Sequence, residues 1–136
     1  MSPLLIISIL AGVALTGLLR IAGRRWALWR MKRFADTYLS RFRQLAEAYD
    51  DNRYDWLLHR STRMQEQLGP LGMTTSATTL YDYDNPWSAP ATPMLSTTLP
   101  EMRARTAHAT AIATCEDAIV RHLGVLDAAL RPRRSD

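Results

Sequence analysis

The chain has three histidines and one cysteine, the residue types that most often bind zinc or pair as a thiol nucleophile and its base. His108, Cys115 and His122 recur every seven residues, which places them near one face of a predicted helix. Seven helical residues span about 10.5 Å, whereas the ligands of one metal ion must meet within a few ångströms. The same separation prevents a cysteine–histidine nucleophile pair. We therefore expect no metal site and interpret Cys115 as a small buried hydrophobic residue.

Other catalytic and cofactor motifs are missing from the sequence. There is no P-loop, Gly-x-Gly-x-x-Gly, His-Glu-x-x-His or Cys-x-x-Cys pattern, and the six glycines are scattered singly. The neighbouring acids Glu116 and Asp117 are typical of a solvated helix face. The sequence therefore predicts a non-enzymatic protein without a cofactor or a small-molecule substrate.

The strongest chemical pattern is an apolar segment followed by a basic one. Met1 to Leu19 contains no charged side chain, and Pro3 to Leu19 would span about 26 Å as a helix, close to the 30 Å core of a bilayer. Arg20 can extend its charged head toward the lipid phosphates while its apolar stem stays in the hydrocarbon, which lengthens the segment that can span the bilayer. The tryptophans that follow favour the headgroup layer. These residues make the predicted membrane interface: Arg20, Arg24, Arg25, Trp26, Trp29, Arg30, Lys32 and Arg33.

This order of charge favours an uncleaved anchor over a signal peptide, because a signal peptide carries its positive charge before the apolar stretch. A buried helix of a soluble protein is the other alternative, but such a helix usually shows a polar face. Basic flanks stay in the cytoplasm. We therefore expect a cell (inner) membrane protein with its N-terminus outside and its C-terminal domain cytoplasmic. Each basic residue near the surface adds about 1 kcal/mol of attraction to anionic lipid headgroups.

Small residues recur on one face of the apolar segment, at Ser8, Gly12 and Thr16. Small side chains at a spacing of four let two membrane helices approach closely. The predicted partner of this face is a second copy or another membrane-protein subunit.

The rest of the chain reads as helices joined by one long loop. After the anchor (1–23), residues 24–69 predict a basic juxtamembrane helix that turns at Asp50–Asn52 into a second helix, although a single merged helix is the alternative. The helix from Arg24 has no Gly or Pro to separate it from the anchor, except at Gly23. Residues 70–98 are rich in Pro, Thr and Ser and predict a loop. Thr98 and Pro100 predict the start of one long C-terminal helix over 99–131, before a tail at 132–136.

We therefore expect an all-α fold: one transmembrane helix followed by a small cytoplasmic three-helix bundle, made of a helical hairpin and the long C-terminal helix. Nucleic-acid binding is not expected, because acids are interleaved with the basic residues that follow the basic segment. The function predicted is a membrane-anchored adaptor or accessory subunit. The alternative is a small oligomeric channel or membrane-perturbing effector gated by the bundle. Aromatic residues supply the candidate partner-binding surface: an exposed Trp56, and Tyr81, Tyr83 and Trp87 in the loop.

Overall fold

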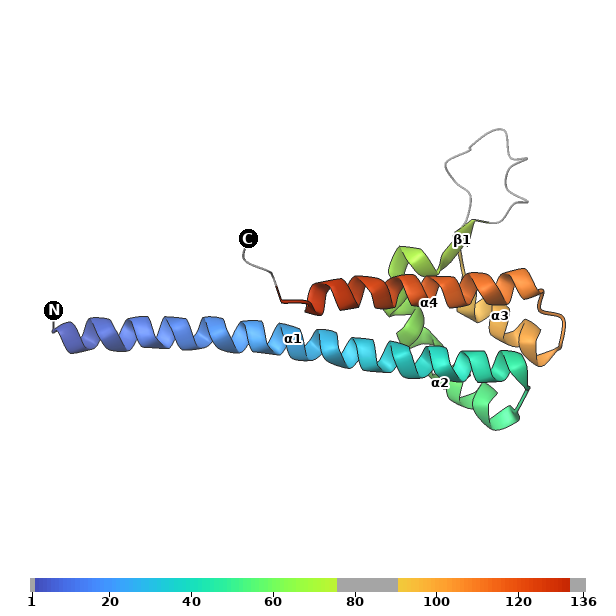
Figure 1. Ribbon diagram of the computed structural model, residues 1–136, viewed down its shortest axis with the longest axis horizontal. Coiled ribbons are helices and arrows are strands. Elements are labelled where there is room, and N and C mark those ends of the chain that lie inside the picture. Colours follow the sequence, from blue (N-terminus) through green and yellow to red (C-terminus); the bar gives the residue numbers. More distant parts are fainter. Residues whose placement is uncertain (1, 76–90, 133–136) are drawn as a thin grey trace, which may run out of the picture.

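The computed structural model describes residues 2–75 and 91–132 of the chain, and it confirms the all-α class (Figure 1). Within these described residues, four α-helices carry the fold, and the strands form one short antiparallel pair with Met73 opposite Pro93. In chain order the elements are α1 (Pro3–Glu47), α2 (Asp51–Leu68), a 3-10 turn (Gly69–Gly72), β1 (Met73–Thr75), β2 (Ala91–Pro93), α3 (Met94–Arg103) and α4 (Ala109–Leu130).

Helix α1 joins the apolar segment to the bundle without interruption. It has 45 residues, so its length is about 68 Å. The helix passes through Gly23 as regular α-helix, and Figure 1 shows a single rod rather than two helices meeting at a bend. The helix from Arg24 is therefore continuous with the apolar segment, and it ends at Glu47.

The hairpin between α1 and α2 is also confirmed. Asp50 caps α2, because its carboxylate accepts a hydrogen bond from the backbone N–H of Asn52 at 3.2 Å. At the other end of α2, Gly69 adopts a φ of 53°, a conformation that is unfavourable for residues with a side chain. The apolar stripe of α2 faces the core and consists of Tyr54, Leu57, Met64 and Leu68. Tyr38 on α1 donates a hydrogen bond to the backbone carbonyl of Leu57.

The predicted loop over 70–98 is wrong at its C-terminal end, because α3 already begins at Met94. Thr98 is consequently a buried residue inside α3 rather than a cap, and Pro100 lies within the helix. The helix forms there because Leu95, Leu99 and Met102 make an apolar stripe that is buried in the core. The frequent prolines of the surrounding sequence obscured that stripe.

The single C-terminal helix predicted over 99–131 is wrong as well, because α3 and α4 are separate helices. Between them Arg105 adopts a φ of 58°, and the backbone N–H groups of Thr106 and Ala107 both donate to the carbonyl of Glu101. This reversal lets α3 pack against α2 while α4 runs back along α1. A straight helix would have left one of the two apolar faces uncovered.

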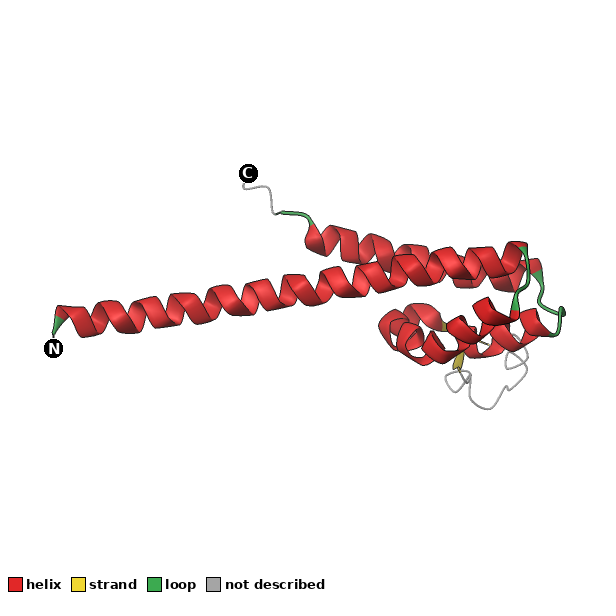
Figure 2. Cartoon of the chain, turned by 90° about the horizontal axis from the view of Figure 1, so that it is seen from below, coloured by secondary structure: helices red, strands yellow, loops and turns green. Residues whose placement is uncertain are grey.

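The core lies between the distal half of α1 and the other three helices. Helix α4 lies antiparallel to α1, and Figure 2 shows it alongside the half of α1 remote from the N-terminus. Cys115 is buried there, as predicted, and its thiol lies 3.3 Å from the Thr98 hydroxyl. The largest fully buried side chains are Tyr38, Phe42, Leu57, Met64, Leu95, Leu99 and Ile119.

His122 gives the bundle a predicted sensitivity to acid. It is buried on α4, its Nε2 lies 3.2 Å from Oε1 of Gln67, and burial lowers the pKa of its imidazole. The unfolded chain therefore binds more protons than the folded one below the ordinary pKa of 6.5. The free energy of unfolding should therefore be highest above pH 6.5 and should decrease as the pH falls toward the lower pKa that His122 has in the folded chain.

We expect the melting temperature of the wild type to decrease between pH 7.5 and pH 5.5. The glutamine of the His122→Gln variant does not titrate, so the melting temperature of this variant should decrease less than that of the wild type over the same interval. His59→Gln is the matched control, because His59 is exposed. Parallel pH profiles for the wild type and His122→Gln would contradict this prediction.

Candidate membrane-contact site

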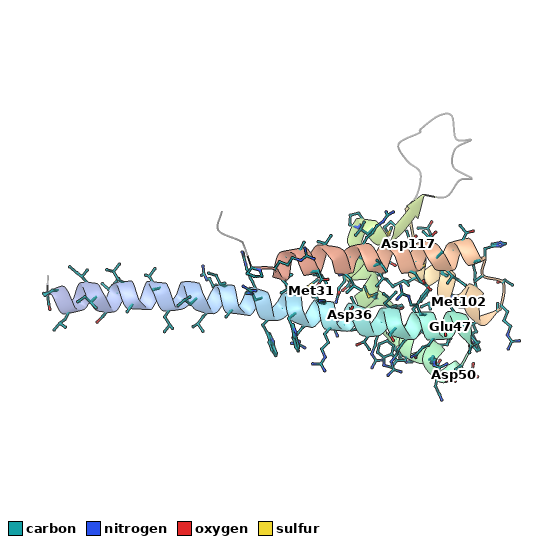
Figure 3. All side chains as sticks on the ribbon, viewed as in Figure 1. Met31, Asp36, Glu47, Asp50, Met102 and Asp117 are labelled. Carbon is teal, nitrogen blue, oxygen red and sulfur yellow. The ribbon has the colours of Figure 1, made fainter. Side chains whose placement is uncertain are left out.

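The first half of α1 is covered by no other part of the described chain. An 18-residue window of this helix has a mean hydropathy of 2.3 and no buried residue. In Figure 3 its side chains project above and below the ribbon, and no other helix lies beside them. Within residues 2–75 and 91–132, α1 is the one helix long and apolar enough to cross a membrane. The exposed large apolar residues of this first half are Leu4, Leu5, Ile6, Ile7, Ile9, Leu10, Val13, Leu15, Leu18, Leu19 and Ile21.

The polar groups of this segment are satisfied within the helix itself. Ser8 donates its hydroxyl proton to the carbonyl of Leu4 at 2.9 Å, and Thr16 donates to the carbonyl of Gly12 at 2.8 Å. Such bonds remove the cost of placing a hydroxyl in hydrocarbon. Nothing lies within 4 Å of a Cβ built on Gly12, so the Ser8, Gly12 and Thr16 face is open in the single chain.

The basic segment begins where the apolar segment ends, and Arg20, Arg24 and Arg30 are exposed on it. Its two tryptophans stack on each other, with the ring centroids of Trp26 and Trp29 at 5.3 Å and an interplanar angle of 24°. The Arg33 guanidinium lies 5.3 Å from the Trp29 ring centroid. This arrangement places aromatic faces and cations together at the position expected for the headgroup layer.

Two of the predicted interface residues have partners inside the bundle. The Arg25 guanidinium donates to the carbonyl of Leu130 at 3.0 Å, and the Lys32 ammonium pairs with Asp127 at 2.5 Å. The hydrogen bond from Lys32 holds the pKa of the Asp127 carboxyl below its usual range. These contacts fasten the C-terminal end of α4 to the basic segment. Sequence reasoning missed this role because it treated the basic residues only as membrane contacts.

Trp56 was expected to be exposed, and this is wrong. It is half-buried on α2, with its ring centroid 6.0 Å from that of Tyr38. The guanidinium groups of Arg41 and Arg60 lie 4.7 and 4.3 Å from the Trp56 ring centroid. Trp56 falls off the main stripe of α2 but still faces α1, because two packed helices also cover the flanks of each other's stripes.

A groove between α1 and α2 brings the predicted residues together with one that the sequence did not single out. The hollow has a volume of about 460 Å³, and Trp26, Trp29, Arg30, Arg33, Trp56 and Arg63 line it. Arg63 reaches it from α2, with its guanidinium 4.1 Å from the Phe34 ring centroid. The spacing of Trp56, Arg60 and Arg63 by four and three residues was the available signal for a shared helix face. We call this feature the Arg63 groove.

The aromatic loop residues Tyr81, Tyr83 and Trp87 lie outside the described residues. Among the described ones, no group of three or more His, Cys, Asp or Glu side chains could hold a metal ion. No protein-family model, curated protein or solved structure matches this chain.

Proposed function

We propose that this chain is a single-pass membrane protein whose helical bundle serves as a non-enzymatic adaptor or accessory subunit of a membrane-associated complex. The observation that carries the proposal is the division of α1 into a fully exposed apolar half and a half that packs in the core. An apolar surface of that extent needs a covering, and a lipid bilayer covers a helix of this length and composition.

The continuity of α1 suits an anchor that sets the position of a bound partner. From Arg20 to Glu47 the helix rises about 40 Å, and α4 is fastened alongside it by the Arg25 and Lys32 contacts. Because no hinge separates the two halves, rotation or tilt of the membrane segment moves the bundle with it. A partner bound to the bundle would therefore be held at a defined height above the membrane.

Charge supports an inner-membrane location with a cytoplasmic bundle. The chain has a single cysteine, so site-specific labelling in a Cys115→Ala background tests the orientation. In intact cells, an impermeant maleimide should label Ser2→Cys and leave Ser40→Cys unlabelled until the membrane is disrupted. The reverse pattern of labelling would contradict the proposed orientation.

The open face of small residues supports pairing of the membrane segment with a second copy or another subunit. Mild-detergent purification of the full-length tagged chain, followed by mass measurement, should find a complex larger than one chain. Gly12→Ile should reduce the mass if this face makes the contact. Ala14→Ile is the matched control on the opposite side of the helix. A monomer without companions in the wild type would contradict the adaptor proposal.

The channel alternative receives less support from the geometry. A conducting pore needs polar groups that face water, whereas the hydroxyls of Ser8 and Thr16 bond to their own helix backbone.

A further inference from the structure

We propose that the Arg63 groove is a binding site for the phosphate-bearing headgroup of one anionic phospholipid. This inference rests on the proposed membrane anchoring and goes beyond it, since general attraction to anionic lipid needs no defined site. The hollow of about 460 Å³ is of the size that holds small ligands.

The charge of the groove indicates an anion. Three of its lining residues are arginines, Arg30, Arg33 and Arg63, and no Asp or Glu side chain lines it. Two helices contribute these cations, so the chain must fold to bring them together. Arginine presents a planar fork of donors that matches two phosphate oxygens at once.

Two of the arginines are stacked on aromatic rings. The guanidinium of Arg33 lies 5.3 Å from the Trp29 centroid, and that of Arg63 lies 4.1 Å from the Phe34 centroid. Stacking occupies one face of a guanidinium and leaves the N–H groups at its edge available for an acceptor. Neither residue has a carboxylate partner within salt-bridge distance among the described residues, unlike Lys32 and Arg43.

The position and the walls of the groove favour a lipid over a free phosphate ion. The wall of the groove nearest to the apolar segment is the Trp26–Trp29 pair. Both tryptophans lie less than two helical turns beyond Ala22. Helical side chains lean toward the N-terminus, so the arginines of α1 lean toward the membrane. The aromatic rings offer apolar contact to the glycerol and upper acyl carbons, which inorganic phosphate lacks.

The test uses the purified full-length chain in dodecyl maltoside, titrated with phosphatidylglycerol and followed by tryptophan fluorescence, because three tryptophans line the groove. A saturable change is expected, with about one lipid per chain. Arg63→Gln should weaken the apparent affinity about tenfold, as for loss of one charge-assisted hydrogen bond. Arg63→Lys should also weaken it, because lysine keeps the charge but lacks the fork.

Arg24→Gln is the matched control. It removes the same charge nearer to the membrane, and nine residues separate Arg24 from Arg33, which places them on opposite sides of α1. Circular dichroism should show that all three variants keep their helix content. The uncharged dodecyl maltoside micelle has no anionic surface that could attract a basic residue outside the groove. The control should therefore bind phosphatidylglycerol within about twofold of the wild type.

Three results would overturn the proposal. If Arg24→Gln and Arg63→Gln weakened the affinity for phosphatidylglycerol equally, the attraction would be diffuse. A fluorescence response of the same size with phosphatidylcholine would show that the groove does not distinguish an anionic headgroup from a zwitterionic one. Saturation and competition by inorganic phosphate at the same concentration would assign the groove to free phosphate instead. None of these results would alter membrane fractionation of the chain, so failure of the groove is distinguishable from failure of the anchor.

Discussion

Leu10→Arg is expected to prevent stable insertion of the chain into the membrane. Leu10 is 63% exposed at the middle of the apolar segment, where the structure offers it no protein neighbour that could accept a charge. An arginine at the centre of a membrane helix costs about 2.5 to 3.5 kcal/mol, and the lost leucine adds about 0.5 kcal/mol. The apolar segment is at the short end of the spanning range, so it has little hydrophobic reserve.

The measurement is the share of full-length chain in the membrane fraction of cells that express each variant. A total cost of about 3 to 4 kcal/mol corresponds to a change in partitioning of several hundredfold. Ser40→Arg is the matched control, because it adds the same charge at an exposed position of α1 within the bundle, and it should fractionate as the wild type does. Equal membrane fractions for Leu10→Arg and the wild type would show that this segment does not cross the hydrocarbon core.

Phe42→Ala is expected to destabilise the bundle strongly while leaving the anchor in place. Phe42 is completely buried on α1, within the core cluster that α2, α3 and α4 close. Removing a buried aromatic ring costs about 3 to 5 kcal/mol. A small domain has a total stability of about 5 to 15 kcal/mol, so one substitution removes a large part of it.

Chemical denaturation of the detergent-solubilised chain, followed by circular dichroism, measures the loss. Val125→Ala is the control, because Val125 is 61% exposed on α4 and its truncation should change stability by less than about 0.5 kcal/mol. Membrane fractionation of Phe42→Ala should match that of the wild type. Similar midpoints for Phe42→Ala and Val125→Ala would contradict the described core.

The parts of the fold that the sequence predicts are those with a long, unbroken pattern. The apolar segment and the stripe of α1 that contains Tyr38 and Phe42 are both continuous, and Asp50 and Gly69 mark the ends of α2 by ordinary capping chemistry. Local patterns therefore suffice for α1, α2 and the turn between them.

Helices α3 and α4 were less predictable because tertiary packing decides their limits. Pro100 normally marks a first turn, yet here burial of Leu95 and Leu99 extends α3 in front of it. The sequence gives no sign of the chain reversal at Arg105. A backbone in the left-handed region usually occurs at glycine, whereas here it occurs at an arginine. Good helix formers on both sides of this residue favoured one continuous helix in the sequence alone.

The candidate site shows the same division between local and tertiary information. The order of the apolar segment, the arginines and the tryptophans is visible in the sequence. The convergence of Arg63 with Arg30 and Arg33, and the fastening of Asp127 by Lys32, depend on how α2 and α4 pack on α1. Arg33 and Arg63 are separated by 30 positions in the sequence, and Lys32 and Asp127 by 95. Local spacing cannot predict contacts between residues so far apart.

The most direct test of the account is alkaline carbonate extraction of membranes that contain the wild-type chain, followed by mass measurement of the extracted and retained protein. Carbonate strips peripheral proteins and leaves those that cross the bilayer. We expect the chain to stay in the membrane pellet with its full mass of 15.4 kDa. Recovery in the soluble fraction, or a mass that lacks the apolar segment, would contradict the central claim that α1 is a retained membrane anchor.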